Sequence, residues 1–324
     1  MLRCCRRVLV LLVACLLSAE VGAAVLRSRR FEGGSYVLVS DVASYYHLGR
    51  NSSDDRQRAV YHDLVVEADR REITLDGVQH WLSAPIYSAQ GKLWVSATDV
   101  LKTLDPVLRR GRTSPALSVR TIVLDPGHGG SDQGATTRRS TEKVLVLDLA
   151  KRLQQQLEAS GFRVWLTRTA DRFIPLESRA EFAAQKRADL FVSLHLNAGG
   201  VANGIETYCL TPAGAVSTAA LFRGWEKSPS QNSDRGNRTD EQNIWLAHCV
   251  QKSLIRSTGA YDRGVRRARF VVLREAPCPA ILVEAGFLTH VGEERKLLNA
   301  EYRTRLAKAI ASGILSYREG VQQR

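Results

Sequence analysis

From residue 121 onward, the pattern of apolar and polar positions switches repeatedly between two periods. Short apolar runs predict strands at 121–124, 163–167, 190–194, 204–208, 270–273 and 280–283. Helical spacing predicts helices at 144–157, 176–186, 244–255 and 293–317. Strands that alternate with helices usually build a mostly parallel sheet with helices on both faces. We therefore expect an α/β fold for residues 121–320.

Residues 31–110 have a different pattern. The stretch Tyr36–Ala43 is echoed by Trp94–Leu101, and in both a short strand runs into Ser or Thr followed by Asp, a pair suited to starting a helix. Between them, an alternating run is centred on Asp76-Gly77, a strong hairpin signal. We predict a small α+β domain here, and a linker at 111–120 that contains Gly and Pro.

The first residues have the layout of a secretory signal peptide. Three arginines precede the apolar run 8–17, and small residues follow at 21–24, which predicts cleavage near Ala23. A transmembrane anchor is an alternative, but the run is short for a bilayer. Lipid attachment at Cys15 is another, although leucines continue the run beyond it. We expect export to the periplasm or the extracellular envelope, without a stable transmembrane anchor.

The net charge of the chain indicates which class of partner it would attract. The formal charge is +13, and it falls to +11 if residues 1–23, with three arginines and one glutamate, are removed. A basic exported protein is drawn to acidic lipids and wall polymers rather than to nucleic acid; the alternative is that the scattered charges serve solubility alone. Outside the signal, Cys209, Cys249 and Cys278 have apolar neighbours, which favours buried free thiols over a disulfide.

Four distant segments offer one chemistry. They are LDPGHGG at 124–130, Thr-Glu-Lys at 141–143, SLHLNA at 193–198 and LVEAGF at 282–287. Open α/β sheets bind ligands at the carboxyl ends of their strands, where three of these segments fall. Two histidines and a carboxylate leave one zinc position open, as hydrolysis requires. We predict that His128, Glu142 and His195 hold one Zn²⁺ and that Glu284 is the catalytic base.

Each of these residues has an ordinary alternative when it is considered alone. His128 could hydrogen-bond its own glycine-rich turn, and a histidine such as His195 after an apolar strand is often simply buried. Glu142 suits a helix start, where the helix dipole favours an acidic side chain. Glu284 is less ordinary, because a charge in an apolar run is costly without a partner. These explanations would have to hold independently for four residues at the same sheet edge, whereas a single metal site accounts for all four together.

Ordered motifs around these residues resemble a known family, the zinc-dependent N-acetylmuramoyl-L-alanine amidases of bacterial peptidoglycan. The resemblance covers residues 120–318 and includes Leu-Thr-Arg at 166–168, Gly-Ile-Glu-Thr-Tyr at 204–208 and Arg-Gly-Val at 263–265. It implies hydrolysis of the amide between N-acetylmuramic acid and L-alanine, with the same zinc ligands and catalytic glutamate. Asn197 and Arg274 are candidates for positioning the substrate, or for loop structure and surface charge instead.

Alternatives to this function remain open at this point. Another zinc peptidase or deacetylase acting on wall material would use the same ligands, and a non-catalytic wall-binding module is a third reading. Residues 31–110 resemble the copper amine oxidase-like N-terminal domain of exported wall proteins, which does not imply copper binding. We expect that domain to be a wall-targeting unit or a spacer. The expected partner is peptidoglycan, and the sequence identifies no activator protein.

Overall fold

The computed structural model describes residues 20–21, 24–31, 34–49, 57–111, 118–218 and 231–322. Residues 1–19, which contain the charged and apolar parts of the predicted signal peptide and Cys15, lie outside the described residues. Among the helices that are described, none is both long and apolar enough to cross a membrane. Cys209, Cys249 and Cys278 are buried free thiols, as predicted.

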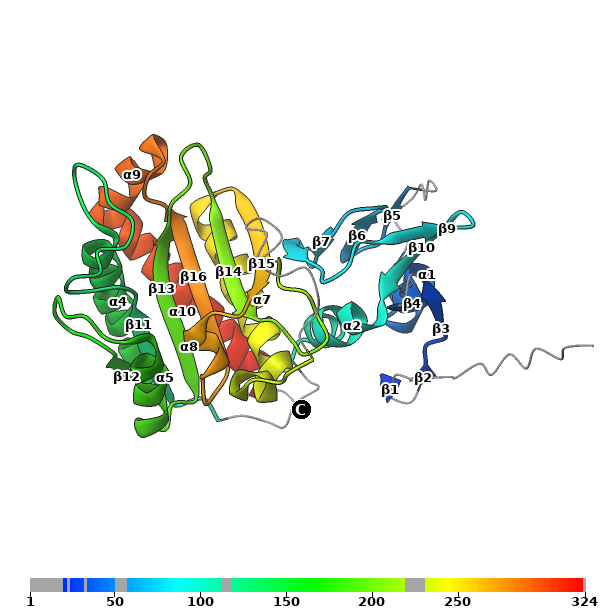
Figure 1. Cartoon of the computed structure of the whole chain (residues 1–324), viewed down its shortest axis with the longest axis horizontal. Helices are drawn as coiled ribbons and strands as arrows, with labels where there is room; N and C mark the ends of the chain where they lie inside the picture. Colours follow the sequence, from blue (N-terminus) through cyan, green and yellow to red (C-terminus); the bar gives the residue numbers. More distant parts are fainter. Residues whose placement is uncertain are drawn as a thin grey trace, which may run out of the picture.

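Six strands form the sheet of the C-terminal region (Figure 1). In spatial order they are β12 (Arg163–Leu166), β11 (Thr121–Pro126), β13 (Leu190–Asn197), β16 (Ala280–Phe287), β14 (Ile205–Leu210) and β15 (Asp262–Ala268). Neighbouring strands run parallel, except that β14 is antiparallel to β16. The expected mostly parallel sheet is therefore confirmed.

Helices cover both faces of this sheet, and alternate strand residues show why. Ile122 and Leu124 of β11 belong to a core shared with three long helices, whereas Val123 between them packs into a second core on the other face. The long helices are α4 (Glu142–Ala159), α7 (Asp240–Thr258) and α10 (Ala300–Gln322). The second face carries the shorter helices α5 (Leu176–Gln185) and α8 (Val271–Arg274). In Figure 1, α10 passes behind the sheet and α8 lies in front of it.

One expected strand of this region needs correction, and the helical region at its end is divided in two. The strand predicted at 270–273 is the short helix α8, whose Val272 and Leu273 are buried in the second core. The strand beside β14 is instead β15, an arginine-rich segment without apolar alternation. The helical region expected at 293–317 is two helices, α9 (Val291–Leu298) and α10. A short 3₁₀ helix (Arg235–Thr239) precedes α7.

The described part of the N-terminal region contains two groups of four strands and a separate pair of short strands. A small antiparallel sheet contains β3 (Ser28–Phe31), β4 (Gly34–Leu38), β10 (Lys92–Ser96) and β9 (Tyr87–Ala89). The strands of the two sequence echoes, β4 and β10, lead into α1 (Val39–Tyr45) and α2 (Ala97–Asp99). A π-helical turn (Val100–Leu104) and α3 (Asp105–Leu108) follow α2, and a separate pair is formed by β1 (Glu20–Val21) and β2 (Ala24–Val25).

The second group is an antiparallel meander that extends the C-terminal sheet. Its strands are β5 (Arg58–Val60), β6 (Leu64–Glu67), β7 (Glu72–Leu75) and β8 (Val78–Trp81). The predicted Asp76-Gly77 hairpin connects β7 to β8, and both turn residues have positive φ. His80 of β8 pairs in parallel with Val265 of β15, so one ten-stranded order runs from β12 to β5. The two regions are thus joined through a shared sheet.

Candidate functional site

Three side chains from separate elements converge at the carboxyl end of the sheet. His128 follows β11, Glu142 is the first residue of α4, and His195 lies in β13. The Nε2 atom of His128 and the Nδ1 atom of His195 each lie 3.0 Å from Oε1 of Glu142. One ligand atom from each residue lies within 4.8 Å of the others. The arrangement can therefore hold a metal ion.

Glycine allows the loop after β11 to approach these ligands closely. A Cβ atom at Gly127 would collide with the imidazole ring of His195. At Gly134, where φ is +64°, a Cβ atom would lie 2.5 Å from Oε2 of Glu142. Any larger residue at either position would separate the loop from the other two ligands. The glycine-rich motif is thus explained by the crowding of the centre.

Hydrogen bonds fix the orientation of two of the ligands. Oδ2 of Asp132 lies 2.8 Å from Nδ1 of His128, so the opposite nitrogen of that ring faces the centre. The backbone N–H of Ala135 donates to Oε2 of Glu142 at 2.8 Å, and that of Leu196 donates to Oε1 at 2.9 Å. Metal sites typically have both kinds of support. A carboxylate hydrogen-bonds to the outer nitrogen of a histidine ligand, and further hydrogen bonds hold the oxygens of a carboxylate ligand.

The electrostatics of the centre favour a charged carboxylate beside imidazoles. Burial alone would favour the protonated acid, yet the hydrogen bonds with His128 and His195 hold the pKa of Glu142 well below its usual value. Burial lowers the pKa of His128, but Glu142 and Asp132 outweigh it and raise that pKa. An ionised, buried carboxylate between two imidazoles is a donor set that suits zinc, with one coordination position left over.

Glu284 lies beside this centre in the middle of β16. It pairs in register with His195 on one side and with Glu206 of β14 on the other, so the three side chains share one face of the sheet. That face is the one covered by α5 and α8. These short helices leave a cavity of about 710 Å³, whose lining includes the three ligands, Asn197 and Glu284. The sheet therefore brings the predicted base and the predicted ligands into one cleft.

A buried polar layer below the cleft holds the His128 loop. Asp125 accepts hydrogen bonds from Thr167 at 2.6 Å, from Ser193 at 2.8 Å and from the guanidinium of Arg179 at 2.8 Å. The same guanidinium donates to the backbone carbonyl of His128 at 2.9 Å. The loop is thus attached to the sheet by a charge pair that is fully shielded from water.

A second arginine adds to this support. Arg168 is buried and donates to the carbonyls of Pro126, Gly127 and Lys143. It therefore ties the His128 loop to the start of α4, which carries Glu142. Sequence reasoning quoted Arg168 within a family motif but gave neither arginine a role. The signal was present, since an arginine that follows an apolar strand needs partners if it is buried.

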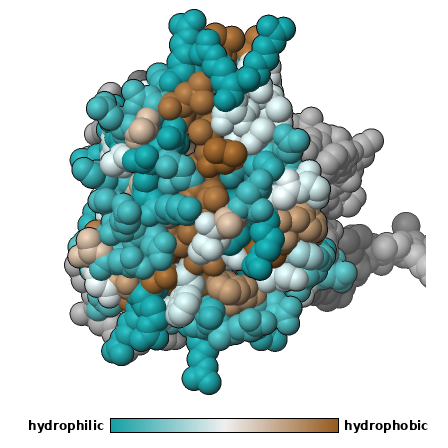
Figure 2. Space-filling view, turned by 90° about the vertical axis from the view of Figure 1, so that its left-hand side faces the viewer, coloured by the Kyte–Doolittle hydropathy of each residue, from teal (hydrophilic) through white to brown (hydrophobic). Residues whose placement is uncertain are grey.

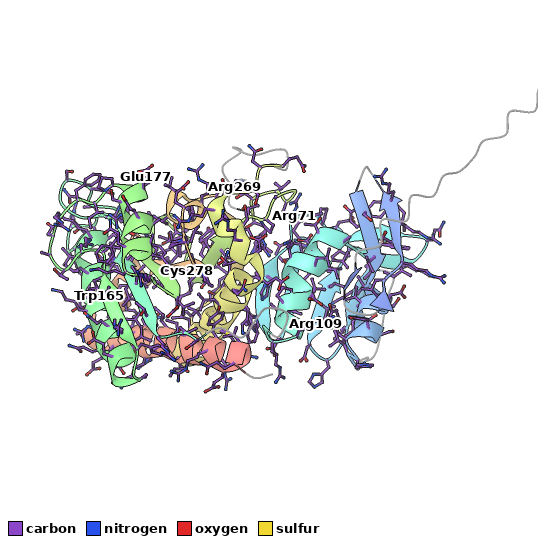
Figure 3. The ribbon with its side chains drawn as sticks, turned by 90° about the horizontal axis from the view of Figure 1, so that it is seen from below. Arg71, Arg109, Trp165, Glu177, Arg269 and Cys278 are labelled. Atoms are coloured by element: carbon purple, nitrogen blue, oxygen red, sulfur yellow. The ribbon has the colours of Figure 1, made fainter. Side chains whose placement is uncertain are left out.

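The cleft has an apolar wall and a few polar groups. Phe173 and Leu176 are about half exposed and Phe270 about a third, and all three line it. Figure 2, which views the molecule from the side of β12, shows apolar residues in a strip bordered by hydrophilic ones. Asn197 lines the cleft. Arg274 is not among the described residues that line it; Arg269 is (Figure 3).

Comparisons with known proteins agree with this geometry. Residues 122–316 match the sequence model of a family described as N-acetylmuramoyl-L-alanine amidase. AmiC of Escherichia coli O6:H1, a protein with this activity in its name, is 36% identical over 230 residues, which are 64% of this chain and 54% of AmiC. AmiA of Salmonella typhimurium LT2, also named as such an amidase, is 36% identical over 276 residues, 78% of this chain and 90% of AmiA.

A solved structure extends the likeness to the fold. The N-acetylmuramoyl-L-alanine amidase from Clostridium difficile 630 is 36% identical, with a TM-score of 0.51. The match covers 63% of this chain and 98% of that one, so nearly the whole of that structure corresponds to about two thirds of the present chain. By contrast, this chain spans only about half the length of E. coli AmiC.

Proposed function

The chain belongs to the N-acetylmuramoyl-L-alanine amidase family, and we propose that it hydrolyses the amide between N-acetylmuramic acid and L-alanine in bacterial peptidoglycan. One observation carries this proposal. Ligand atoms of His128, Glu142 and His195 lie within 4.8 Å of one another, in a cleft that also contains Glu284. A metal ion held by such ligands can activate a water molecule, and a neighbouring carboxylate can act as the base, which together support hydrolysis.

Zinc is the metal we assign to this centre. Two imidazole nitrogens and one carboxylate oxygen form a common catalytic zinc set, which leaves one position open. When bound, zinc lowers the pKa of water and polarises an amide carbonyl. Asp132 supports the assignment, because it holds His128 in the tautomer whose Nε2 lone pair faces the centre. One ion per chain is expected.

Glu284 is the proposed catalytic base. Its carboxylate accepts a proton from the attacking water and then donates a proton to the nitrogen of the departing L-alanine. The bond that breaks joins the lactyl carbonyl carbon of the sugar to that nitrogen. The products are a lactyl carboxylate on N-acetylmuramic acid and a stem peptide with a free amino group. The strand register supports this role, because it pairs Glu284 with His195, a proposed zinc ligand.

The cleft walls suit a substrate with both methyl and polar groups. The apolar side chains of Phe173, Leu176 and Phe270 face the cavity and would contact the lactyl and alanyl methyls. Asn197 would position polar groups, because its Nδ2 atom is already held 2.7 Å from Glu206. Arg269 lines the cleft, where it pairs with Asp234 at 3.1 Å, so it is a better candidate than Arg274 for contacting a stem-peptide carboxylate.

We further propose that the protein acts outside the cytoplasm. Peptidoglycan lies there, and the residues before Ala24 have the composition of a signal peptide. Lipid attachment at Cys15 remains the alternative form of export. The net charge of +11 without residues 1–23 would favour association with anionic wall polymers.

The experiment that tests this function uses the purified chain without residues 1–23 and isolated peptidoglycan. We expect it to release stem peptides that begin with L-alanine, and we expect a zinc chelator to abolish the release. Readdition of zinc should restore it. Released acetate would indicate a deacetylase, and shortened stems still attached to sugar would indicate a peptidase; either product without free L-alanine termini would overturn the proposal.

A further inference from the structure

The meander of the N-terminal region contacts the C-terminal sheet at one tightly fitted strand. The backbone N–H of Gln79 in β8 donates to Oδ2 of Asp262 at 2.8 Å. Gly264 of β15 has φ +88°, and a Cβ atom there would lie 2.7 Å from the carbonyl oxygen of Gln79. The two strands therefore meet backbone against backbone. Such a fit places the last residue of β8 at a defined point on β15.

That last residue is Trp81, which makes two directed contacts with β15. Its Nε1–H donates to the backbone carbonyl of Arg263 at 3.0 Å. Its ring stacks against the guanidinium of Arg266, whose Cζ lies 4.5 Å from the ring centroid. A stacked guanidinium is held in one plane, so its N–H groups point in fixed directions. Trp81 thus orients one arginine and supports the backbone of another.

Both arginines point to one buried carboxylate. Oε2 of Glu206 lies 2.8 Å from Nε of Arg263 and 3.1 Å from Nε of Arg266, and the residue is only 2% exposed. Its other oxygen accepts hydrogen bonds from Asn197 at 2.7 Å and from the hydroxyl of Tyr208 at 2.8 Å. A buried carboxylate with four such partners has one orientation.

Glu206 is also the direct strand neighbour of Glu284. The two residues pair in register between β14 and β16, so their side chains lie next to each other on the cleft face. Two neighbouring carboxylates repel each other unless one is neutralised. Arg263 and Arg266 neutralise the charge of Glu206 and restrict the movement of its side chain. The chain of contacts from Trp81 therefore ends at the proposed base.

We propose that Trp81, a residue of the N-terminal region, is a positioning residue for the active site. It fixes Arg263 and Arg266, these fix Glu206, and Glu206 in turn fixes Asn197 and the surroundings of Glu284. The proposal rests on the proposed function for the identity of the reaction, but the contact chain itself does not. It gives residues 31–110 a role in catalysis that neither a spacer nor a wall-targeting unit would have.

The test compares three single variants of the full chain. Trp81→Ala removes both contacts, and Trp81→Phe keeps a ring over Arg266 but loses the N–H. The matched control is Trp165→Ala at the opposite edge of the same sheet, where the Nζ atom of Lys186 lies 4.1 Å from the ring centroid. Figure 3 shows Trp165 at the end of the molecule away from the N-terminal region.

Steady-state kinetics on a soluble muramyl peptide provide the first readout. Misplaced catalytic groups lower turnover more than they weaken substrate binding. We expect Trp81→Ala to lower kcat by about tenfold with little change in KM or in bound zinc. The kcat of Trp81→Phe should lie between those of Trp81→Ala and the wild type, and the kcat of Trp165→Ala should equal that of the wild type. Wild-type kcat in both folded Trp81 variants would overturn the proposal, and if Trp81→Ala does not fold, Trp81→Phe decides.

Hydrogen–deuterium exchange provides a readout that does not depend on the reaction. We expect the amides of residues 205–208 and 282–287 to exchange faster in Trp81→Ala than in Trp165→Ala. If the wild type fails to cleave the muramyl peptide, the proposed function is wrong while this comparison still tests the contact chain. Unchanged exchange in both segments would overturn the positioning role whatever the substrate proves to be.

Discussion

Asp132 and His128 form a carboxylate–imidazole pair in which Oδ2 lies 2.8 Å from Nδ1, and the remaining nitrogen of the ring faces Glu142. This pair decides which nitrogen of His128 is available to a metal ion. Both residues lie in one glycine-rich loop, so their geometry is set locally. The centre thus has its supporting carboxylate within the same motif that supplies the ligand.

Replacement of this carboxylate should weaken zinc binding without unfolding the protein. Loss of a hydrogen-bonded support behind a histidine ligand typically costs about 10–100-fold in metal affinity. We expect that loss for Asp132→Asn, measured by competition with a calibrated chelator. Asp148→Asn, which alters a partly exposed carboxylate of α4 that pairs with Arg152 and Arg303 away from the cleft, is the control and should retain wild-type affinity. Equal affinities in the two variants would show that Asp132 does not support the ligand.

Removal of the proposed base should separate metal binding from turnover. Glu284→Gln preserves the size of the side chain but cannot accept a proton, so we expect full zinc content and a loss of about 10²–10⁴-fold in kcat. His195→Ala should lose zinc instead. Metal analysis and kinetics on the same samples check both results, with Glu158→Gln on the exposed face of α4 as the control. Near wild-type kcat in Glu284→Gln would remove Glu284 from the mechanism.

The contact between the two regions should weaken in acid. His80 and His248 are fully buried there, with His80 Nε2 3.1 Å from His248 Nδ1, and burial lowers the pKa of both. The charged groups that face them are those of Asp76, Lys252, Asp262 and Arg267.

The sign of the effect follows from where the proton binds. The unfolded chain has ordinary histidines with pKa values of about 6.5 and takes up protons first as the pH falls. Stability contributed by the two neutral histidines is therefore complete above about pH 6.5 and is lost below it. Each histidine can change the free energy of unfolding by at most about 1.4 kcal/mol per pH unit. Denaturant unfolding at pH 7.5 and 5.5 measures this loss in the free energy of unfolding. The loss should be smaller in His80→Gln than in the wild type. An equal pH dependence in the two proteins would contradict the role of His80.

The polar layer under the cleft should be expensive to disturb. Asp125→Asn leaves the buried guanidinium of Arg179 without its charged partner, and breaking such a pair typically costs about 3–5 kcal/mol. Asp148, which is partly exposed and pairs with both Arg152 and Arg303, is the comparison, and Asp148→Asn should cost about 1 kcal/mol or less for each pair. Denaturant titrations of both variants provide the free energies, and similar values would argue against a structural role for Asp125.

Local patterns made much of this protein predictable. The apolar runs before His128, His195 and Glu284 indicated strands, and parallel strands bring their carboxyl ends to one edge, so the site residues could be grouped without a structure. Glu142 was predictable for the same reason, because a helix start after a glycine-rich loop must return to that edge. The structure brings the side chains of His128, Glu142 and His195 together at that edge.

What could not be predicted depends on long-range charge pairing. Arg263, Arg266 and Arg267 make β15 look like a polar loop, yet all three are held by partners distant in the sequence. These partners include Glu206 and, in the π-helical turn, the carbonyl oxygen of Lys102 and the hydroxyl of Thr103. The joining of β8 to β15 was hidden for the same reason, since it consists of the His80–Val265 pair, the hydrogen bond from Gln79 to Asp262 and the contacts of Trp81. Periodicity cannot identify a strand whose charges are buried with partners.

The central claim concerns which amide is hydrolysed, and isotope labelling tests it most directly. A muramyl peptide is digested with the zinc-loaded enzyme in water enriched in ¹⁸O, and the products are analysed by mass spectrometry. We predict one ¹⁸O atom in the lactyl carboxylate of the sugar product and an unlabelled stem peptide that begins with free L-alanine. Label in released acetate, or in a carboxylate of the stem peptide, would contradict the claim.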